Sequence, residues 1–147
     1  MDPFLPLRIC ATGLRVQRLR MDLIASNIAN VNTTQTPQGG PYRRKDLLVA
    51  AVPAVSNFDF SDILEANLNN SLYKVIPISV IEDQRPFKVV YQPSHPDADK
   101  NGYVKLPNIS PLEEMVNMIS ALRAYEANVT VINNTKSMIL KALEIGR

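Results

Sequence analysis

Residues 24–34 read Ile-Ala-Ser-Asn-Ile-Ala-Asn-Val-Asn-Thr-Thr, and this Asn-rich run closes a long segment with the periodicity of a helix. The segment, residues 5–31, repeats an apolar side chain every seven positions over about four heptads, which is the spacing of a helix seam. The repeating residues are Leu7, Leu14, Met21 and Ile28. Such a seam needs a partner, because a long amphipathic helix is only marginally stable alone in water.

A second helical segment lies at the other end of the chain, over residues 111–145. Ser110 suits the N-cap and Pro111 the first helical position, and two glutamates follow in the first turn, where negative charge is favoured. At ~1.5 Å per residue this helix would reach about 50 Å, which is long for a single small domain. Its apolar positions are Leu112, Met115, Ile119, Leu122, Val129, Ile132, Ile139 and Leu143.

The middle of the chain has the composition of loops and short strands. Residues 32–42 combine Thr, Gly and Pro too densely to sustain a helix. The link at 83–85 suits a hairpin, and Asn101-Gly102 is a strong turn signal, so we expect one small sheet of three or four strands. β-branched and aromatic residues predict the strands at 47–52, 73–82, 86–91 and 103–106.

Residues 53–72 carry weaker signals: 61–66 suits a short helix and 67–71 a loop. The whole pattern predicts an α+β fold, with long N- and C-terminal helices packed as a coiled-coil-like pair and a small β-rich central unit. The expected division of the chain is 1–34 for the N-terminal helix and its Asn-rich signature, 35–110 for the central loop and β unit, and 111–147 for the C-terminal helix.

The totals are those of a globular protein with one modest core, since 46% of the 147 residues are apolar. No stretch approaches the ~20 apolar residues of a membrane span, so no direct membrane insertion is expected. Pro6 and Arg8 interrupt the start of the chain too early for a cleavable signal peptide. The single cysteine, Cys10, has no partner for an internal disulfide and suits a small buried hydrophobe.

Charge is distributed unevenly along the chain. Residues 1–45 hold seven Arg or Lys against two Asp, whereas the rest holds nine basic and twelve acidic residues. Opposite signs in the two parts would help neighbouring copies to associate. The N-terminal Arg residues fall between the apolar positions of the helix, which favours a solvated helix face over a nucleic-acid-binding surface.

Signals for chemistry are weak. Residues 97–102 match the first half of an EF-hand loop, but Asn108 stands where the bidentate Glu is needed, so a polar turn is the better interpretation. His95 is the only histidine and lies between two prolines. No nucleophile, phosphate-binding or metal-ligand motif occurs. We therefore expect a protein that is not an enzyme and has no cofactor, metal or small-molecule substrate.

Asn residues within the helix stripes are more informative. A polar amide in a packed seam lowers stability but fixes register and partner number, although an exposed helix edge would give the same spacing. A self-contained helical hairpin, acting as a scaffold or binding module, is the alternative to an assembly subunit. The side chains expected at helix interfaces are Leu7, Leu14, Met21, Asn27, Ile28, Asn30, Asn32, Met115, Ile119, Leu122, Glu126, Asn128, Val129 and Ile132.

Several motifs resemble the flagellar rod and hook axial proteins. The N-terminal signature is Ala11-Thr12-Gly13-Leu14-Arg15-Val16-Gln17 with Asn27-Ile28-Ala29-Asn30-Val31-Asn32-Thr33-Thr34, and Tyr42-Arg43-Arg44 fits the extension after it. Arg123-Ala124-Tyr125-Glu126-Ala127-Asn128 resembles the closing helix of that family. The central Tyr91-Gln92-Pro93-Ser94-His95-Pro96-Asp97-Ala98-Asp99 and the chain length are similar to the C-type proximal-rod members.

The resemblance implies a structural subunit of the bacterial flagellar basal body. It implies export through the flagellar type III apparatus without signal cleavage, and assembly in the periplasm into the rod. The partners implied are copies of the same chain, other flagellar rod proteins and the export apparatus. The terminal helices of many copies would form a hollow, torque-transmitting tube, with the middle unit outside it and the ends ordering on assembly.

Overall fold

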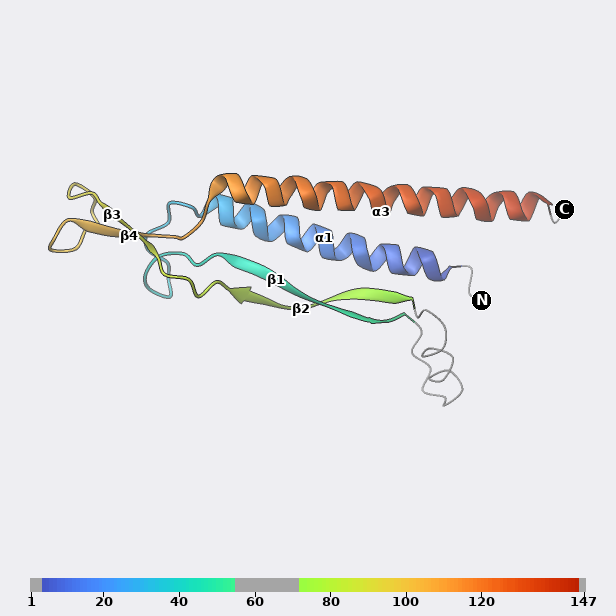
Figure 1. The fold of residues 1–147 in the computed structure, drawn as a ribbon, viewed down its shortest axis with the longest axis horizontal. Coiled ribbons are helices and arrows are strands. Elements are labelled where there is room, and N and C mark those ends of the chain that lie inside the picture. The colour runs from blue at the N-terminus through green and yellow to red at the C-terminus, as the bar shows by residue number, and fades with distance from the viewer. Residues whose placement is uncertain (1–3, 55–71, 146–147) are drawn as a thin grey trace, which may run out of the picture. The chain divides into compact units, whose positions relative to one another are not determined.

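The computed structural model describes residues 4–54 and 72–145, and its elements are shown in Figure 1. Within these residues, one long helix lies toward each end of the chain and four strands lie between the two helices, as the α+β prediction requires. The elements are α1 (Leu5–Ala29), β1 (Lys45–Pro53), β2 (Tyr73–Glu82), β3 (Lys88–Tyr91), β4 (Tyr103–Leu106) and α3 (Pro111–Ile145). The short helix and loop expected at 61–66 and 67–71 lie outside the described residues.

Polar side chains determine where α1 ends and where α3 begins. Asn30 ends α1, because its Nδ2 donates to the Ser26 carbonyl at 2.9 Å and its Oδ1 accepts from the Thr33 hydroxyl at 3.1 Å. At the start of α3 the Ser110 carbonyl accepts the Glu114 N–H at 3.0 Å, and Ser110 Oγ lies 3.5 Å from the Glu113 nitrogen. The predicted N-cap at Ser110, with Pro111 as the first helical residue, is thus confirmed.

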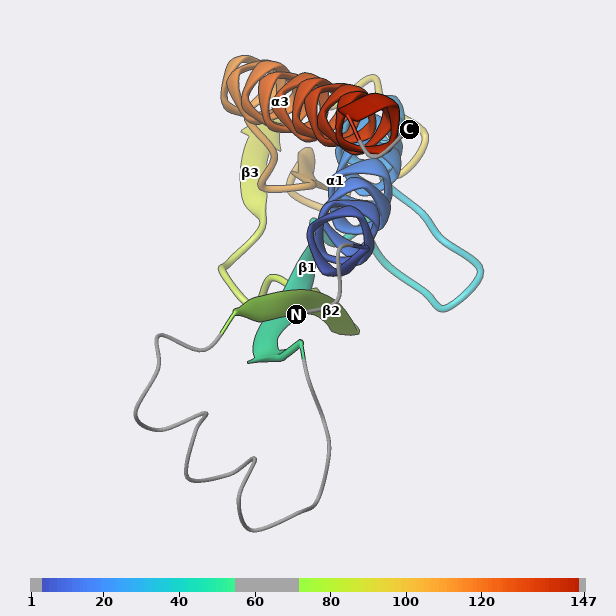
Figure 2. The same cartoon turned by 90° about the vertical axis from the view of Figure 1, so that its right-hand side faces the viewer.

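The strands pair differently from the prediction. β1 pairs with β2 and β3 with β4, so the expected single sheet of three or four strands is wrong. The ribbons of β1 and β2 lie against each other in Figure 2. The link at 83–85 does not form the expected hairpin, because β2 pairs with β1 and β3 pairs with β4. Within the link, Asp83 accepts hydrogen bonds from the Arg85 backbone and side chain, at 2.9 and 2.7 Å, and closes a local turn. The Asp83 N–H instead donates to the Arg44 carbonyl, beside the start of β1.

The β3–β4 hairpin has a closely defined register, with Val90 opposite Val104 and Tyr91 opposite Tyr103. Its loop ends at Gly102, where φ is +82° and an added Cβ would lie 2.9 Å from Tyr91 Cε2. Only glycine is suited to that position, for both reasons. The turn predicted from Asn101-Gly102 is therefore confirmed.

Asp99 organises this turn from an exposed position. Its Oδ1 accepts the backbone N–H groups of Asn101 and Tyr103, at 2.8 and 3.0 Å. These bonds, that from Tyr103 first, hold the pKa of Asp99 below its ordinary value. Because the folded pKa is depressed, the stabilisation is fully present above the unfolded pKa and is lost as pH falls through the folded value.

We therefore predict acid-dependent loosening of the turn. In an NMR titration the amide shifts of Asn101 and Tyr103 should move together, with a midpoint below the ordinary value for aspartate of about 3.9. Asp99→Asn keeps an oxygen acceptor and should abolish that titration step. A midpoint at or above the ordinary value would contradict the prediction.

The chain divides into two compact units, each of which draws on both helices. Among the described residues, the first unit comprises 4–18, 49–54, 72–78 and 122–145, and the second comprises 19–48 and 79–121. In the second unit the end of α1 and the start of α3 run antiparallel, since Asn27 meets Glu114 while Arg20 and Ile24 lie near Ala121. The apolar core of this unit contains Ile24, Tyr42, Leu47, Val104 and Ala121.

In the first unit a close helix contact brings α1 against α3. A Cβ built on Gly13 would lie 3.1 Å from Asn128 Oδ1, so the missing side chain of Gly13 leaves the space that the Asn128 amide occupies. Val16 and Thr135 are also buried in this unit. The described helices therefore pair through small and polar residues as well as apolar ones.

Candidate assembly interface

A fully bonded asparagine lies at the centre of the second unit. Asn27 is 0% exposed, and its Nδ2 donates to the Lys45 carbonyl at 2.9 Å and to Glu114 Oε2 at 3.0 Å. Its Oδ1 accepts the Lys45 N–H at 2.9 Å and the Tyr42 hydroxyl at 3.2 Å. The amide thus uses both donors and both acceptor positions. The Asn27 amide bonds both the N–H and the C=O of Lys45, the first residue of β1, as a neighbouring β-strand would.

Glu114 is the charged member of this cluster and is 1% exposed. Its Oε1 accepts from Arg44 Nε at 2.8 Å, while its Oε2 faces Asn27. Burial opposes the charge on Arg44, but hydrogen bonds and attraction to Glu114 and Asp46 outweigh it and hold the pKa of Arg44 above its ordinary value. The carboxylate is therefore paired at both oxygens, as a buried charge requires.

Local sequence patterns predicted only part of this cluster. They placed Asn27 in a packed seam, Glu114 in the first turn of a helix, where negative charge is favoured, and Arg44 in a family motif. One weak signal for the burial of Glu114 exists: the residue stands seven positions before the small Ala121, on the same face of α3. Nothing in the local sequence names Arg44 as its partner.

The opposite face of α3 is apolar and exposed at its start. Leu112, Met115, Val116 and Ile119 are 72%, 55%, 60% and 51% exposed. Their spacing of i, i+3, i+4 and i+7 forms one stripe along a helix. Ile119 follows Glu114 by about 1.4 helical turns, so the stripe points away from the buried cluster. We name these four residues the outer stripe.

The remaining interface candidates on α1 are less exposed. The heptad residues on α1 are all half-buried, beside the buried side chains of Val16, Ile24 and Asn27. These heptad residues are Leu7, Leu14, Met21 and Ile28. Asn30 is half-buried at the helix end and Asn32 is exposed beyond it.

Along α3 the predicted apolar stripe divides between two faces. Leu122 and Glu126 are exposed, as the outer stripe is, whereas Asn128, Val129 and Ile132 are half-buried. Glu126 and Asn128 are two positions apart, which at 3.6 residues per turn places them on nearly opposite sides of the helix. The sequence predicted one apolar stripe on α3. Its residues therefore belong to two faces, one directed toward α1 and one exposed to solvent.

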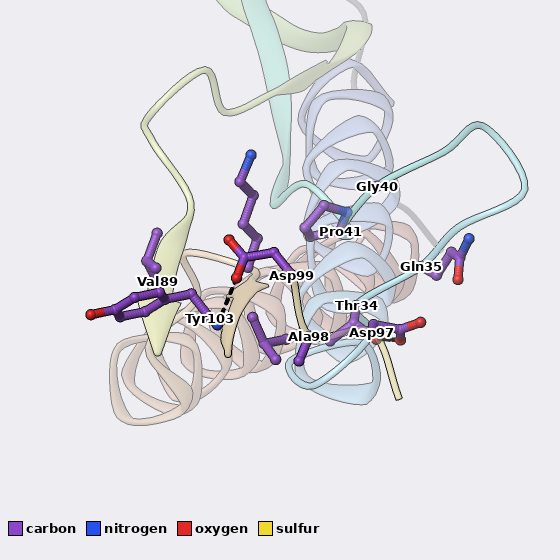
Figure 3. A pocket seen from close by; sticks show the side chains of 11 residues that line it. Thr34, Gln35, Gly40, Pro41, Val89, Asp97, Ala98, Asp99 and Tyr103 are labelled. Atoms are coloured by element: carbon purple, nitrogen blue, oxygen red, sulfur yellow. Dashed lines mark hydrogen bonds between the residues drawn. The ribbon is translucent and has the colours of Figure 1, made fainter. Parts of the chain in front are cut away.

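An open cavity of about 360 Å³ lies beside the β3–β4 hairpin, and its lining is shown in Figure 3. Two carboxylates line it, but both are engaged: Asp97 accepts from the Thr34 hydroxyl at 2.7 Å, and Asp99 holds its turn.

Within residues 4–54 and 72–145, no group of three or more His, Cys, Asp or Glu side chains could hold a metal ion. Neither described helix is long and apolar enough to cross a membrane.

Comparisons with known proteins identify the family. A family model described as flagella basal body rod protein matches residues 7–35, and one described as flagellar basal body rod FlgEFG protein C-terminal matches residues 100–145. The flagellar basal-body rod protein FlgC of Borreliella burgdorferi is 48% identical to this chain, covering 99% of this chain and 98% of its own length.

Two further FlgC proteins match at similar length. That of Bacillus subtilis is 42% identical over 100% of both chains, and that of Salmonella typhimurium is 40% identical over 95% of this chain and 94% of its own. The chain therefore belongs to the FlgC family of flagellar basal-body rod proteins.

Proposed function

We propose that this protein builds its part of the flagellar rod through the outer stripe of α3, which packs against a helix of a neighbouring copy. As a member of its family it is a structural subunit of the flagellar basal-body rod and not an enzyme. It assembles with copies of itself and with other rod components in the basal body. Similarity over the full length to rod proteins favours this function over a self-contained scaffold or binding module.

The observation that carries the proposal is the exposure of four large apolar side chains in one row. Full burial of an exposed side chain of this kind contributes about 1.5–3 kcal/mol. Each of these partly exposed side chains would gain part of that, so the row favours contact with another apolar surface. The spacing of the row is the one that a helix presents to a partner helix or groove. A contact repeated from copy to copy, without closing, would extend a helical array.

The finer features of the function belong to the same proposal. Residues 1–34 and 111–147 would form the axial part of a hollow, torque-transmitting shaft, with residues 35–110 outside it. The wider set of interface residues from the sequence, Leu7 to Ile132, would complete the contacts between copies. The subunit would reach the periplasmic part of the rod through the flagellar type III export apparatus.

Photo-crosslinking in living cells tests the proposed contact. A photoreactive phenylalanine analogue replacing Val116 should join this chain to a rod subunit once basal bodies have formed, because Val116 lies in the outer stripe. The same variant in cells whose flagellar export is blocked should give no such product, which controls for contacts made before assembly. Purified basal bodies without a crosslinked rod subunit at any position of the stripe would overturn the proposal.

A further inference from the structure

We infer that Asn27, Arg44 and Glu114 form a register lock, which fixes how far α1 and α3 are displaced along one another within a single subunit. The three side chains come from three separate segments: the last turns of α1, the residue before β1 and the first turn of α3. All three lie in the second compact unit. The inference concerns the isolated chain and goes beyond its role in the rod.

The first support for the lock is that its members depend on one another. Glu114 would be a buried charge without Arg44, and its second oxygen would be unpaired without Asn27. Asn27 also holds both backbone groups of Lys45, and so keeps Arg44 in place beside the carboxylate. Removing one member leaves a buried polar group unsatisfied, which is more unfavourable than losing one surface contact.

The second support comes from the side-chain contacts that would form if α1 and α3 were displaced along one another. A shift of α1 by one turn would place Leu23 or Ile24 opposite Glu114 in place of Asn27. A shift of α3 by four positions would place Met118 opposite the Asn27 amide, and a shift by three positions would place Asn117 there. The slips that bring in Leu23, Ile24 or Met118 bury a polar group against hydrocarbon, whereas a purely apolar seam would exchange one apolar contact for another.

The register lock also determines which face of α3 is available to a neighbouring subunit. With Glu114 directed toward α1, the outer stripe is held on the far side of α3, because Ile119 lies about 1.4 turns further along. Rotating or sliding α3 would displace that stripe. The polar cluster therefore positions the apolar surface, although no member of it belongs to the surface.

Paramagnetic relaxation in solution measures the register directly. In a Cys10→Ser background, a nitroxide on Asp22→Cys should broaden the amides of residues 111–121 with a single maximum. Glu114→Gln keeps the size of the side chain but turns a donor toward Asn27 or Arg44, so it should add a second maximum about three to four residues away, one helical turn. Glu113→Gln removes the same charge from the exposed neighbouring position and should keep the single maximum.

An identical profile for Glu114→Gln and Glu113→Gln would overturn the lock. If Glu114→Gln does not fold, Arg44→Lys provides the second test, because it keeps the positive charge but lacks the Nε–H that bonds Glu114. A broadened or doubled profile for Arg44→Lys is expected. A single unshifted maximum in that variant would equally refute the inference.

Discussion

Replacing Ile119 with aspartate is expected to abolish rod assembly and motility while leaving the subunit folded. Ile119 is 51% exposed on the outer stripe, so the isolated chain has little burial to lose. Its folding free energy should change by no more than about 0.5–1 kcal/mol, the usual range for a surface site with a change in helix propensity. In the assembled rod the same carboxylate would enter an apolar contact without a partner, at several kcal/mol for each copy.

Two measurements separate the effects on folding and on assembly. Thermal unfolding by circular dichroism compares the variant chain with the parent, and swimming in soft agar with recovery of basal bodies reports assembly. Ile119→Leu keeps an apolar side chain of similar volume and should support normal motility. Swimming at the parent rate by the Ile119→Asp strain would show that the outer stripe is not a subunit contact.

Local patterns predicted the elements well, since each element is largely specified by its own residues. The 5–31 and 111–145 helices are observed at Leu5–Ala29 and Pro111–Ile145, and the strand predicted at 73–82 matches β2. Periodicity, the cap at Ser110 and β-branched runs are all signals within a few positions of one another. The interface residues chosen from these patterns stay a prediction.

Strand partners and the polar cluster required knowledge of contacts distant in sequence. Glu114 lies 87 residues from Asn27 and 70 from Arg44, so no local window contains the charge and its partners together. The pairing of β1 with β2 likewise joins segments that are separated in the sequence by residues 54–72, and local turn chemistry pointed to another hairpin. Sequence patterns thus located the helices. They placed Glu114 in the first turn of a helix, where negative charge is favoured, and did not indicate that its carboxylate is buried against the other helix.

The largest loss of stability is expected from Glu114→Ala. This change leaves the Asn27 N–H without its acceptor and takes from Arg44 the closer of its two carboxylate partners, at 2.8 Å against 3.1 Å for Asp46. Breaking a buried ion pair by removing one partner typically destabilises a protein by about 3–5 kcal/mol. Since small domains have a free energy of unfolding of about 5–15 kcal/mol, the second unit would be close to unfolding.

Glu113→Ala is the matched control, because it removes the same side chain one position earlier from an exposed site. Urea unfolding followed by circular dichroism should show a large decrease in midpoint for Glu114→Ala and a change within about 0.5 kcal/mol for Glu113→Ala. Equal urea midpoints for the two variants would mean that the buried carboxylate of Glu114 contributes no more to the free energy of unfolding than the solvated carboxylate of Glu113. In that case hydrophobic contacts alone, around Ile24 and Ala121, would have to hold the helix pair together.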